Sequence, residues 1–345
     1  MSVEEQGQSP DPSAEAGTGR FSAWMPSGGT TLVILERFGL LLLLFAIIVA
    51  FSVALPDSFP TDQTLTAIVS SQPAAIFAAF AVLVPLIAGE FDLSVGFGLG
   101  FTSVFFAWLM GNEITFALAL LIVVVIGLMI GAVNGWLVVH LGMNSFIATL
   151  GSGTILSGLI LYFTNGQILS ENLPQGLLDA TRTEVVGIVL PVFYVVAVGL
   201  FMWYVLEHTP LGRRMYATGA GVEAARLTGI NTQRLRFFSF VAGSMLWVIA
   251  GLINTGRIGA AYPDIGPSFL LPAFAACFLG ATAIKPRYFN VWGTVAASIL
   301  VVVGVTGFQQ AGVKEWIEPV FTGMVLLLAV AISVRTSVLR ARLHD

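Results

Sequence analysis

Residues 207–236 read EHTPLGRRMYATGAGVEAARLTGINTQRLR and separate two long apolar runs. Five of the chain's 15 basic residues fall in this segment: Arg213, Arg214, Arg226, Arg234 and Arg236. Because the flanking runs are almost uncharged, the segment must lie in water. Residues 222–227 are good helix formers, and Gly229 is placed to end a short helix. The segment therefore predicts an exposed helix between two membrane spans, suited to docking in a groove of another protein.

The composition excludes a soluble globular protein. Of 345 residues, 57% are hydrophobic and only 10% are charged, whereas soluble domains carry about 25% charged residues. The single cysteine, Cys277, rules out an intrachain disulfide and is expected to be inert packing within an apolar run. Residues 1–30 are rich in Ser, Gly, Pro and acidic residues, without the basic and apolar regions of a signal peptide. They are predicted to form a disordered cytoplasmic tail.

Ten apolar runs follow this tail, and two of them are short. Because backbone groups find no water in lipid, each run should be helical. We therefore expect an all-α polytopic membrane protein of about ten transmembrane helices, with broken or re-entrant segments. The transmembrane domain is placed at 31–335 and a second cytoplasmic tail at 336–345. The apolar runs lie at about 38–55, 66–88, 96–110, 115–139, 146–164, 186–206, 237–256, 269–284, 291–311 and 317–334.

The positions of the basic residues set the orientation, because cytoplasmic loops carry an excess of Lys and Arg. With residues 207–236 inside and ten spans alternating, twelve of the 15 basic residues are cytoplasmic. Only Arg182, Arg257 and Lys314 then lie outside. Both termini are predicted to be cytoplasmic. Residues 165–184 face the exterior, either as a connecting loop or as a docking surface for an external partner.

One predicted span carries small residues along a single face. Gly127, Gly131 and Gly135 recur every four residues, a pattern that lets two helices approach closely. Asn134 lies beside this face. A buried amide needs partners, so Asn134 either cross-links helices or lines a path for a polar solute.

Two breaks interrupt the apolar pattern. Residues 88–96 (AGEFDLSVG) place Glu90 and Asp92 between apolar runs, where a charge must reach an interface, a partner or a water-filled cavity. Asp92 and Ser94 could cap the following helix. The stretch is either an interfacial turn or a functional gate element. Residues 256–267 contain three glycines and two prolines and should form an outer loop that could be partly re-entrant.

Five short motifs resemble those of the permease subunits of bacterial ABC importers of the ribose, xylose and autoinducer-2 type. The resemblance covers about residues 30–335. The segment 279–287 (LGATAIKPR) departs from the glycine pairs usual in the family, which indicates a divergent branch. The motifs are EFDLSVG at 90–96, Asn134-Gly135, FIATLG at 146–151, TPLGR at 209–213 and EAARLTGI at 223–230.

The resemblance implies the transmembrane subunit of an ATP-driven importer in the bacterial inner membrane. Two permeases, either two copies or sister chains, would form the path for a sugar or similar small polar solute. The implied partners are cytoplasmic ATPase subunits and an extracytoplasmic solute-binding protein. ATPase coupling is expected at Glu223, Ala224, Ala225, Arg226 and Gly229, and Glu90, Asp92, Ser94 and Asn134 are candidates for the path.

The sequence is consistent with hydrolysis of ATP on a partner. It contains no GxxxxGK[ST] motif, and neither Lys285 nor Lys314 is followed by Ser or Thr. We expect no catalytic residue, metal, cofactor or nucleic acid on this chain. The alternatives are an ATP-independent secondary transporter or channel and, third, a membrane-embedded enzyme. Ion coupling is disfavoured because only Glu90 and Asp92 bring charge near the spans.

Overall fold

The computed structural model describes residues 28–344, with side chains from 38 to 331. The described part of the chain is almost entirely helical, with one short strand pair. Residues 1–27 of the predicted tail lie outside the described residues, and 336–344 continue the last helix. The elements are α1 (Gly28–Ala54), α2 (Asp62–Ser71), α3 (Pro73–Ile87), α4 (Ser94–Gly111), α5 (Phe116–Val139), α6 (Ser145–Thr164), α7 (Gln175–Arg182), β1 (Glu184–Val185), β2 (Ile188–Val189), α8 (Leu190–His208), α9 (Pro210–Ala220), α10 (Val222–Leu227), α11 (Thr232–Ile258), α12 (Ile265–Gly280), α13 (Val291–Gln310) and α14 (Ile317–His344).

The helices confirm the all-α polytopic prediction. Among the described residues, seven helical segments are long and apolar enough to cross a membrane, and α2 with α3 counts as one of them. The other three predicted spans form apolar helices of fewer than 18 described residues: Phe38–Ala54, Ile265–Gly280 and Ile317–Ala331. The run predicted at 66–88 is broken after Gln72, because Pro73 begins α3 as its first residue.

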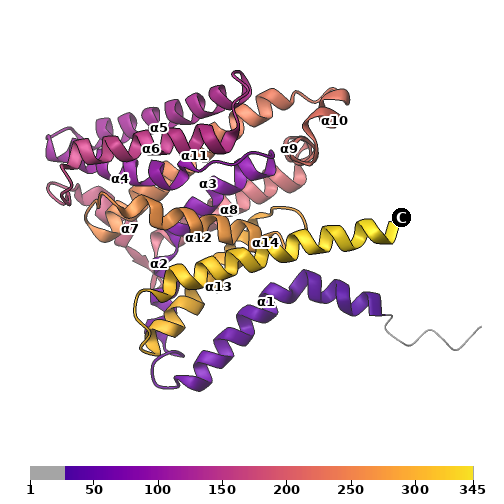
Figure 1. Cartoon of the computed structure of the whole chain (residues 1–345). Helices are drawn as coiled ribbons and strands as arrows, with labels where there is room; N and C mark the ends of the chain where they lie inside the picture. Colours follow the sequence, from indigo (N-terminus) through magenta and orange to yellow (C-terminus); the bar gives the residue numbers. More distant parts are fainter. Residues whose placement is uncertain (1–27, 345) are drawn as a thin grey trace, which may run out of the picture.

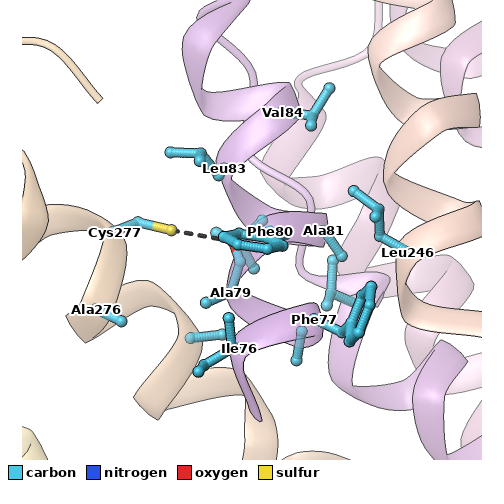
Figure 2. Close-up of a cluster of buried hydrophobic side chains, with 14 of the residues drawn as sticks. Ile76, Phe77, Ala79, Phe80, Ala81, Leu83, Val84, Leu246, Ala276 and Cys277 are labelled. Atoms are coloured by element: carbon cyan, nitrogen blue, oxygen red, sulfur yellow. Dashed lines mark hydrogen bonds between the residues drawn. The ribbon is translucent and has the colours of Figure 1, made fainter. Parts of the chain in front are cut away.

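Helix α3 lies at the centre of the bundle and is buried on all sides. Phe77 and Phe80 are fully inaccessible, and their rings meet edge to face at a centroid distance of 6.2 Å. Figure 2 shows them between α11, which contributes Leu246, and α12, which contributes Cys277. The Cys277 thiol donates to the Ala79 carbonyl at 3.2 Å. Cys277 is therefore buried packing, as predicted.

The glycine face of α5 packs on α11. A Cβ atom built at Gly131 would lie 2.4 Å from Ser244 Oγ, and one built at Gly127 would lie 2.3 Å from a methyl group of Val248. Gly135 meets Phe237 in the same way. Side chains at these positions would force the helices apart, so the prediction of close helix packing is confirmed.

The segment 165–189 is more ordered than the sequence suggested. Residues 165–184 contain α7, whose Leu177 and Thr181 are buried, and Arg182 Nε donates to the Gly256 carbonyl of α11 at 2.9 Å. An antiparallel strand pair, β1–β2, follows, so α8 begins at Leu190 rather than at residue 186. The sequence analysis did not predict these strands.

The second predicted break is shorter than expected. Gly259, at φ +80°, ends α11, and α12 begins at Ile265. Gly256 therefore lies inside α11, and Gly266 lies in the first turn of α12. The Gly266 backbone packs on Gly96 of α4, because a Cβ atom at Gly266 would lie 2.5 Å from the Gly96 carbonyl oxygen.

Candidate functional site

The turn between α3 and α4, residues 88–93, is the centre of the candidate site. Gly89 ends α3 with a φ of +85°, a left-handed conformation that glycine adopts without strain. The Glu90 amide then donates to the Pro85 carbonyl at 2.9 Å, the hydrogen bond that closes a Schellman-type helix end. The turn is consequently tight, and it carries both acidic residues into the protein.

Asp92, Ser94 and Asn134 form one buried hydrogen-bond network. Asp92 Oδ1 accepts from the Ser94 amide at 2.9 Å and from the Ser94 hydroxyl at 2.5 Å. Ser94 Oγ in turn accepts from Asn134 Nδ2 at 2.9 Å. Asp92 thus caps the first residue of α4, as predicted, whereas the Ser94 hydroxyl binds Asp92 instead of a backbone amide. Asn134 cross-links α4 and α5.

Two groups of this network are buried at a cost in free energy: the amide oxygen of Asn134 and the carboxyl group of Asp92. Asn134 Oδ1 is buried and has no hydrogen-bond partner within the described part of the chain. Burial raises the pKa of Asp92 to about 6, although the hydrogen bonds from Ser94 oppose this shift. Buried polar groups that are only partly satisfied are costly in free energy.

Glu90 lies apart from this network and forms an ion pair. Its Oε1 accepts from Arg236 Nε of α11 at 2.5 Å, and the Glu90 side chain is nearly buried. Because two carboxylates in a weakly charged chain need a cation nearby, sequence reasoning could have sought this partner among the few arginines. It did not assign Arg236 this role. The pair fixes the start of α11 to the turn.

Two hydroxyl groups of α6 hold the backbone of the same turn. The Ser145 hydroxyl accepts from the Phe91 amide at 3.2 Å, and the Thr149 hydroxyl accepts from the Leu93 amide at 3.0 Å. Both are buried. The sequence analysis missed these residues, although the FIATLG motif at 146–151 includes Thr149.

Helix α9 packs directly beneath the turn. Its Gly219 touches the end of α3, and a Cβ atom there would lie 2.2 Å from the Ile87 carbonyl oxygen and 3.1 Å from the Gly89 amide nitrogen. Only glycine permits this approach of two backbones. The sequence analysis predicted neither α9 nor this contact.

The same helix reaches a second turn, residues 281–290, between α12 and α13. The Tyr216 hydroxyl donates to the Phe289 carbonyl at 2.6 Å, and its ring meets Tyr288 at a centroid distance of 5.7 Å. Burial and the nearby Glu207 raise the pKa of Tyr216, so the hydroxyl keeps its proton. Glu207 also pairs with Lys285 at 2.7 Å. One helix therefore contacts both turns.

Helix α10 is the exposed element predicted at 222–227. Glu223 and Arg226 pair at 2.7 Å on its exposed face, as their spacing indicated. Gly229 has a φ of +83° just after the helix, as expected of a residue that ends it. Ala224 is exposed, and so is Leu227, which sequence reasoning overlooked and which is 86% accessible.

The two alanines of the predicted docking surface differ in exposure. Ala225 is buried within this chain, with 5% of its surface accessible, whereas Ala224 is exposed. The Ala225 carbonyl accepts from the Thr228 and Ile230 amides at the helix end. The free face of α10 consists of Ala224, the Glu223–Arg226 pair and Leu227.

The described side chains offer no cluster of three or more His, Cys, Asp or Glu residues that could hold a metal ion. The described residues instead form a series of contacts that runs from α10 to the buried network. The exposed helix α10 directly follows α9 in the chain. Helix α9 contacts two turns, and one of these turns carries the buried polar network.

Comparison with known proteins identifies the family. Residues 63–330 match the family described as "Branched-chain amino acid transport system / permease component". The ribose import permease protein of Haemophilus influenzae is 31% identical over 305 residues, which cover 88% of this chain and 93% of that protein. The ribose import permease protein of Escherichia coli K12 is 30% identical over 304 residues, covering 87% of this chain and 94% of that protein.

The autoinducer 2 import system permease protein of Salmonella choleraesuis is 28% identical over 290 residues, covering 83% of this chain and 82% of that protein. No solved structure matches the chain. The family match spans most of the apolar helices, the 88–93 turn, the buried network, α9 and α10. The chain is therefore a multi-pass membrane protein that belongs to this family of transport-system permease components.

Proposed function

We propose that this chain is the transmembrane subunit of an ATP-driven importer and forms the path for a sugar or similar small polar solute. The curated relatives are permeases named for ribose and autoinducer-2 import, which supports the proposal. ATP is hydrolysed on separate cytoplasmic subunits. A second permease, identical or related, completes the path, and an extracytoplasmic solute-binding protein delivers the solute.

The observation that carries this proposal is the position of α9. Helix α9 directly precedes the exposed α10. It contacts the 88–93 turn through Gly219 and the 281–290 turn through Tyr216. A displacement of α10 by a docked ATPase is passed to both turns through these contacts. Because packed interfaces switch between discrete arrangements, a small displacement is sufficient to change the state of the path.

The buried network supplies the next step of the mechanism. The 88–93 turn is held by Ser145 and Thr149 of α6 and by Arg236 of α11, and it carries Asp92 at the start of α4. Movement of the turn changes the hydrogen bonds between Asp92, Ser94 and Asn134. These bonds join α4 to α5, so the relative position of the helices changes with them. Glu90, Asp92, Ser94 and Asn134 then act as positioning residues of the path.

The proposed orientation places both termini, α9 and α10 in the cytoplasm of a bacterial cell, beneath the inner membrane. In Figure 1, α9, α10 and the C-terminal end of α14 lie at one end of the bundle, and α7 lies at the other. This arrangement agrees with the distribution of Lys and Arg. Residues 31–335 are the permease domain, with 207–236 as its coupling segment.

The test of this function is to enlarge the exposed face of α10. Ala224→Trp places a bulky ring where an ATPase would dock, and Leu141→Trp, on another exposed position of the cytoplasmic side, is the matched control. We expect Ala224→Trp to release the ATPase or to uncouple hydrolysis from uptake. The control should behave as the unmodified protein.

Both variants are purified with the ATPase subunits. Association, solute-stimulated ATP hydrolysis and uptake into proteoliposomes are measured. Normal values of all three for Ala224→Trp would mean that α10 is not the coupling element. Uptake by the permease alone, without ATPase or ATP, would instead show a secondary transporter or channel.

A further inference from the structure

A cavity of about 410 Å³ lies outside the coupling site, and none of its lining residues belongs to the two turns that α9 contacts. Its volume is within the range of about 300–1,000 Å³ that is usual for small-molecule sites. The walls come from α2, the start of α3, α12, α13 and α14. The lining includes Ser71, Gln72, Phe269, Pro272, Thr306 and Gln309, together with Ser298, Glu318 and Thr322.

Four polar side chains in this cavity have no hydrogen-bond partner among the described residues. They are Thr306 and Gln309 of α13 and Glu318 and Thr322 of α14; Gln309 and Glu318 are exposed, and only Thr322 is buried. Thr322 is the strongest evidence for a ligand, because its hydroxyl is buried and only 2% of the residue is accessible. An unsatisfied buried hydroxyl costs about 1–3 kcal/mol. Its retention on a cavity wall indicates that a ligand completes its hydrogen bonds.

The spacing of these residues places each pair on one face of its helix, where both side chains can line the same cavity. Thr306 and Gln309 are three apart on α13, and Glu318 and Thr322 are four apart on α14, so each pair shares a helix face. Both pairs line the cavity. Together they offer two hydroxyls, one amide and one carboxylate, a set that can both donate to and accept from several hydroxyl groups.

The charge and the apolar wall restrict the class of ligand. Glu318 is the only ionisable group in the lining, and no Lys, Arg or His is present there. An anionic phosphate or sulfate is therefore disfavoured. The Phe269 ring and Pro272 supply a surface against which the C–H groups of a sugar ring can pack.

We propose that this cavity is a binding subsite for a neutral polyhydroxylated molecule of pentose or hexose size. The inference rests on the proposed import function and assigns its solute a binding position within this chain. Gln309 and Glu318 flank residues 311–316, which the distribution of basic residues places outside the cell. The subsite is thus the first binding position that a delivered solute meets, ahead of the coupling network on the cytoplasmic side.

Equilibrium binding to the purified permease tests this subsite without the ATPase. The probes are radiolabelled D-ribose, D-xylose, D-glucose and xylitol, with leucine as a zwitterion, putrescine as a cation and ribose 5-phosphate as an anion. The variants are Thr322→Val and Glu318→Gln. Glu315→Gln removes the same charge three residues earlier, outside the cavity lining, and is the matched control.

We expect at least one neutral sugar or polyol to bind saturably. Thr322→Val should weaken that binding about fivefold and Glu318→Gln about tenfold, while Glu315→Gln changes nothing. Thermal unfolding serves as the folding control, because replacing an unpaired buried hydroxyl with a methyl group should not lower Tm. Glu318 is exposed, so its variant should also keep Tm.

Two results would overturn the subsite. One is the absence of saturable binding by every neutral probe, including the case in which only leucine, putrescine or ribose 5-phosphate binds. The other is sugar binding with the same Kd in the wild type and in both cavity variants. Failure of the proposed function is separate, because it appears as a lack of ATP-dependent uptake by the complete transporter.

Discussion

Adding one methyl group at Gly219 tests whether α9 transmits movement to the 88–93 turn. In Gly219→Ala the new Cβ atom would lie 2.2 Å from the Ile87 carbonyl oxygen, whereas ordinary van der Waals contact begins at 3.4 Å. Both partners are backbone, so neither can rotate away. The helix and the turn must therefore separate by about 1 Å, and overpacking of this kind costs about 1–3 kcal/mol.

This strain determines the size of the expected effect. Alanine is a better helix former than glycine by about 1 kcal/mol, which offsets part of the loss of stability. If the strain falls on only one of the two transport states, 1–3 kcal/mol changes their ratio by about 5- to 150-fold. We expect a small decrease in Tm and a decrease of at least about fivefold in uptake per ATP hydrolysed.

The matched control lies two residues further along the chain. A Cβ atom at Gly221 would have its nearest neighbour, Ala224 Cβ, at an ordinary 3.8 Å, and the φ of 176° is extended backbone that alanine adopts. Both variants are reconstituted with the ATPase, and hydrolysis and uptake are measured together. Unchanged uptake per ATP in Gly219→Ala, or an equal decrease in Gly221→Ala, would refute the transmission through α9.

Three further predictions concern orientation, the ion pair and the network. Cysteines introduced at the exposed positions Gln175 and Gln233 should label oppositely with an impermeant reagent in intact cells, and equal labelling of both from outside would contradict the ten-span topology. Arg236→Gln should lower the free energy of unfolding by about 3 kcal/mol, because it leaves the nearly buried Glu90 carboxylate unpaired, and Glu90→Gln should lower it less, because the Arg236 side chain is 22% exposed. The double variant should lose less than the sum, and strict additivity in chemical denaturation would exclude the pair as a unit. Asp92→Asn should insert and assemble but transport poorly, and full transport would reduce the motif to a structural turn. Because burial raises the pKa of Asp92 from 3.8 to about 6, wild-type stability should fall as pH rises from about 4 to about 6, and the Asn variant should lack this decrease.

Much of the architecture could be predicted from local sequence because the membrane removes alternatives. A run such as 115–139 can satisfy its backbone groups in lipid only as a helix. Every predicted apolar run is helical over most of its length in the structure, although the run 66–88 is broken at Gln72 and the run 186–206 begins with strand β2. The exposed helix at 222–227, its Glu223–Arg226 pair and the ending glycine at 229 follow from neighbouring residues. The glycine face of α5 could also be predicted from the sequence, because residues four apart lie on one side of a helix.

The tertiary structure decided the contacts between residues far apart in the sequence. Glu90 and Arg236 are 146 residues apart, and no local rule pairs them. The role of Gly219 depends on which backbone lies beside it, and its own sequence neighbourhood does not reveal the end of α3. Ala225 looked as available as Ala224, but the rotation of a six-residue helix on its support buries one and exposes the other.

The cavity is the clearest example of a feature that local sequence does not reveal and tertiary packing creates. Thr306, Gln309, Glu318 and Thr322 appear in the sequence as unremarkable polar residues near the ends of two spans. Helical periodicity places each pair on one face, but only the packing of α13 against α14 turns the two faces toward one space. Sequence thus determined which segments cross the membrane, because solvation acts on each segment separately. Tertiary structure decided which polar groups meet, because that depends on how the segments rotate and pack against one another.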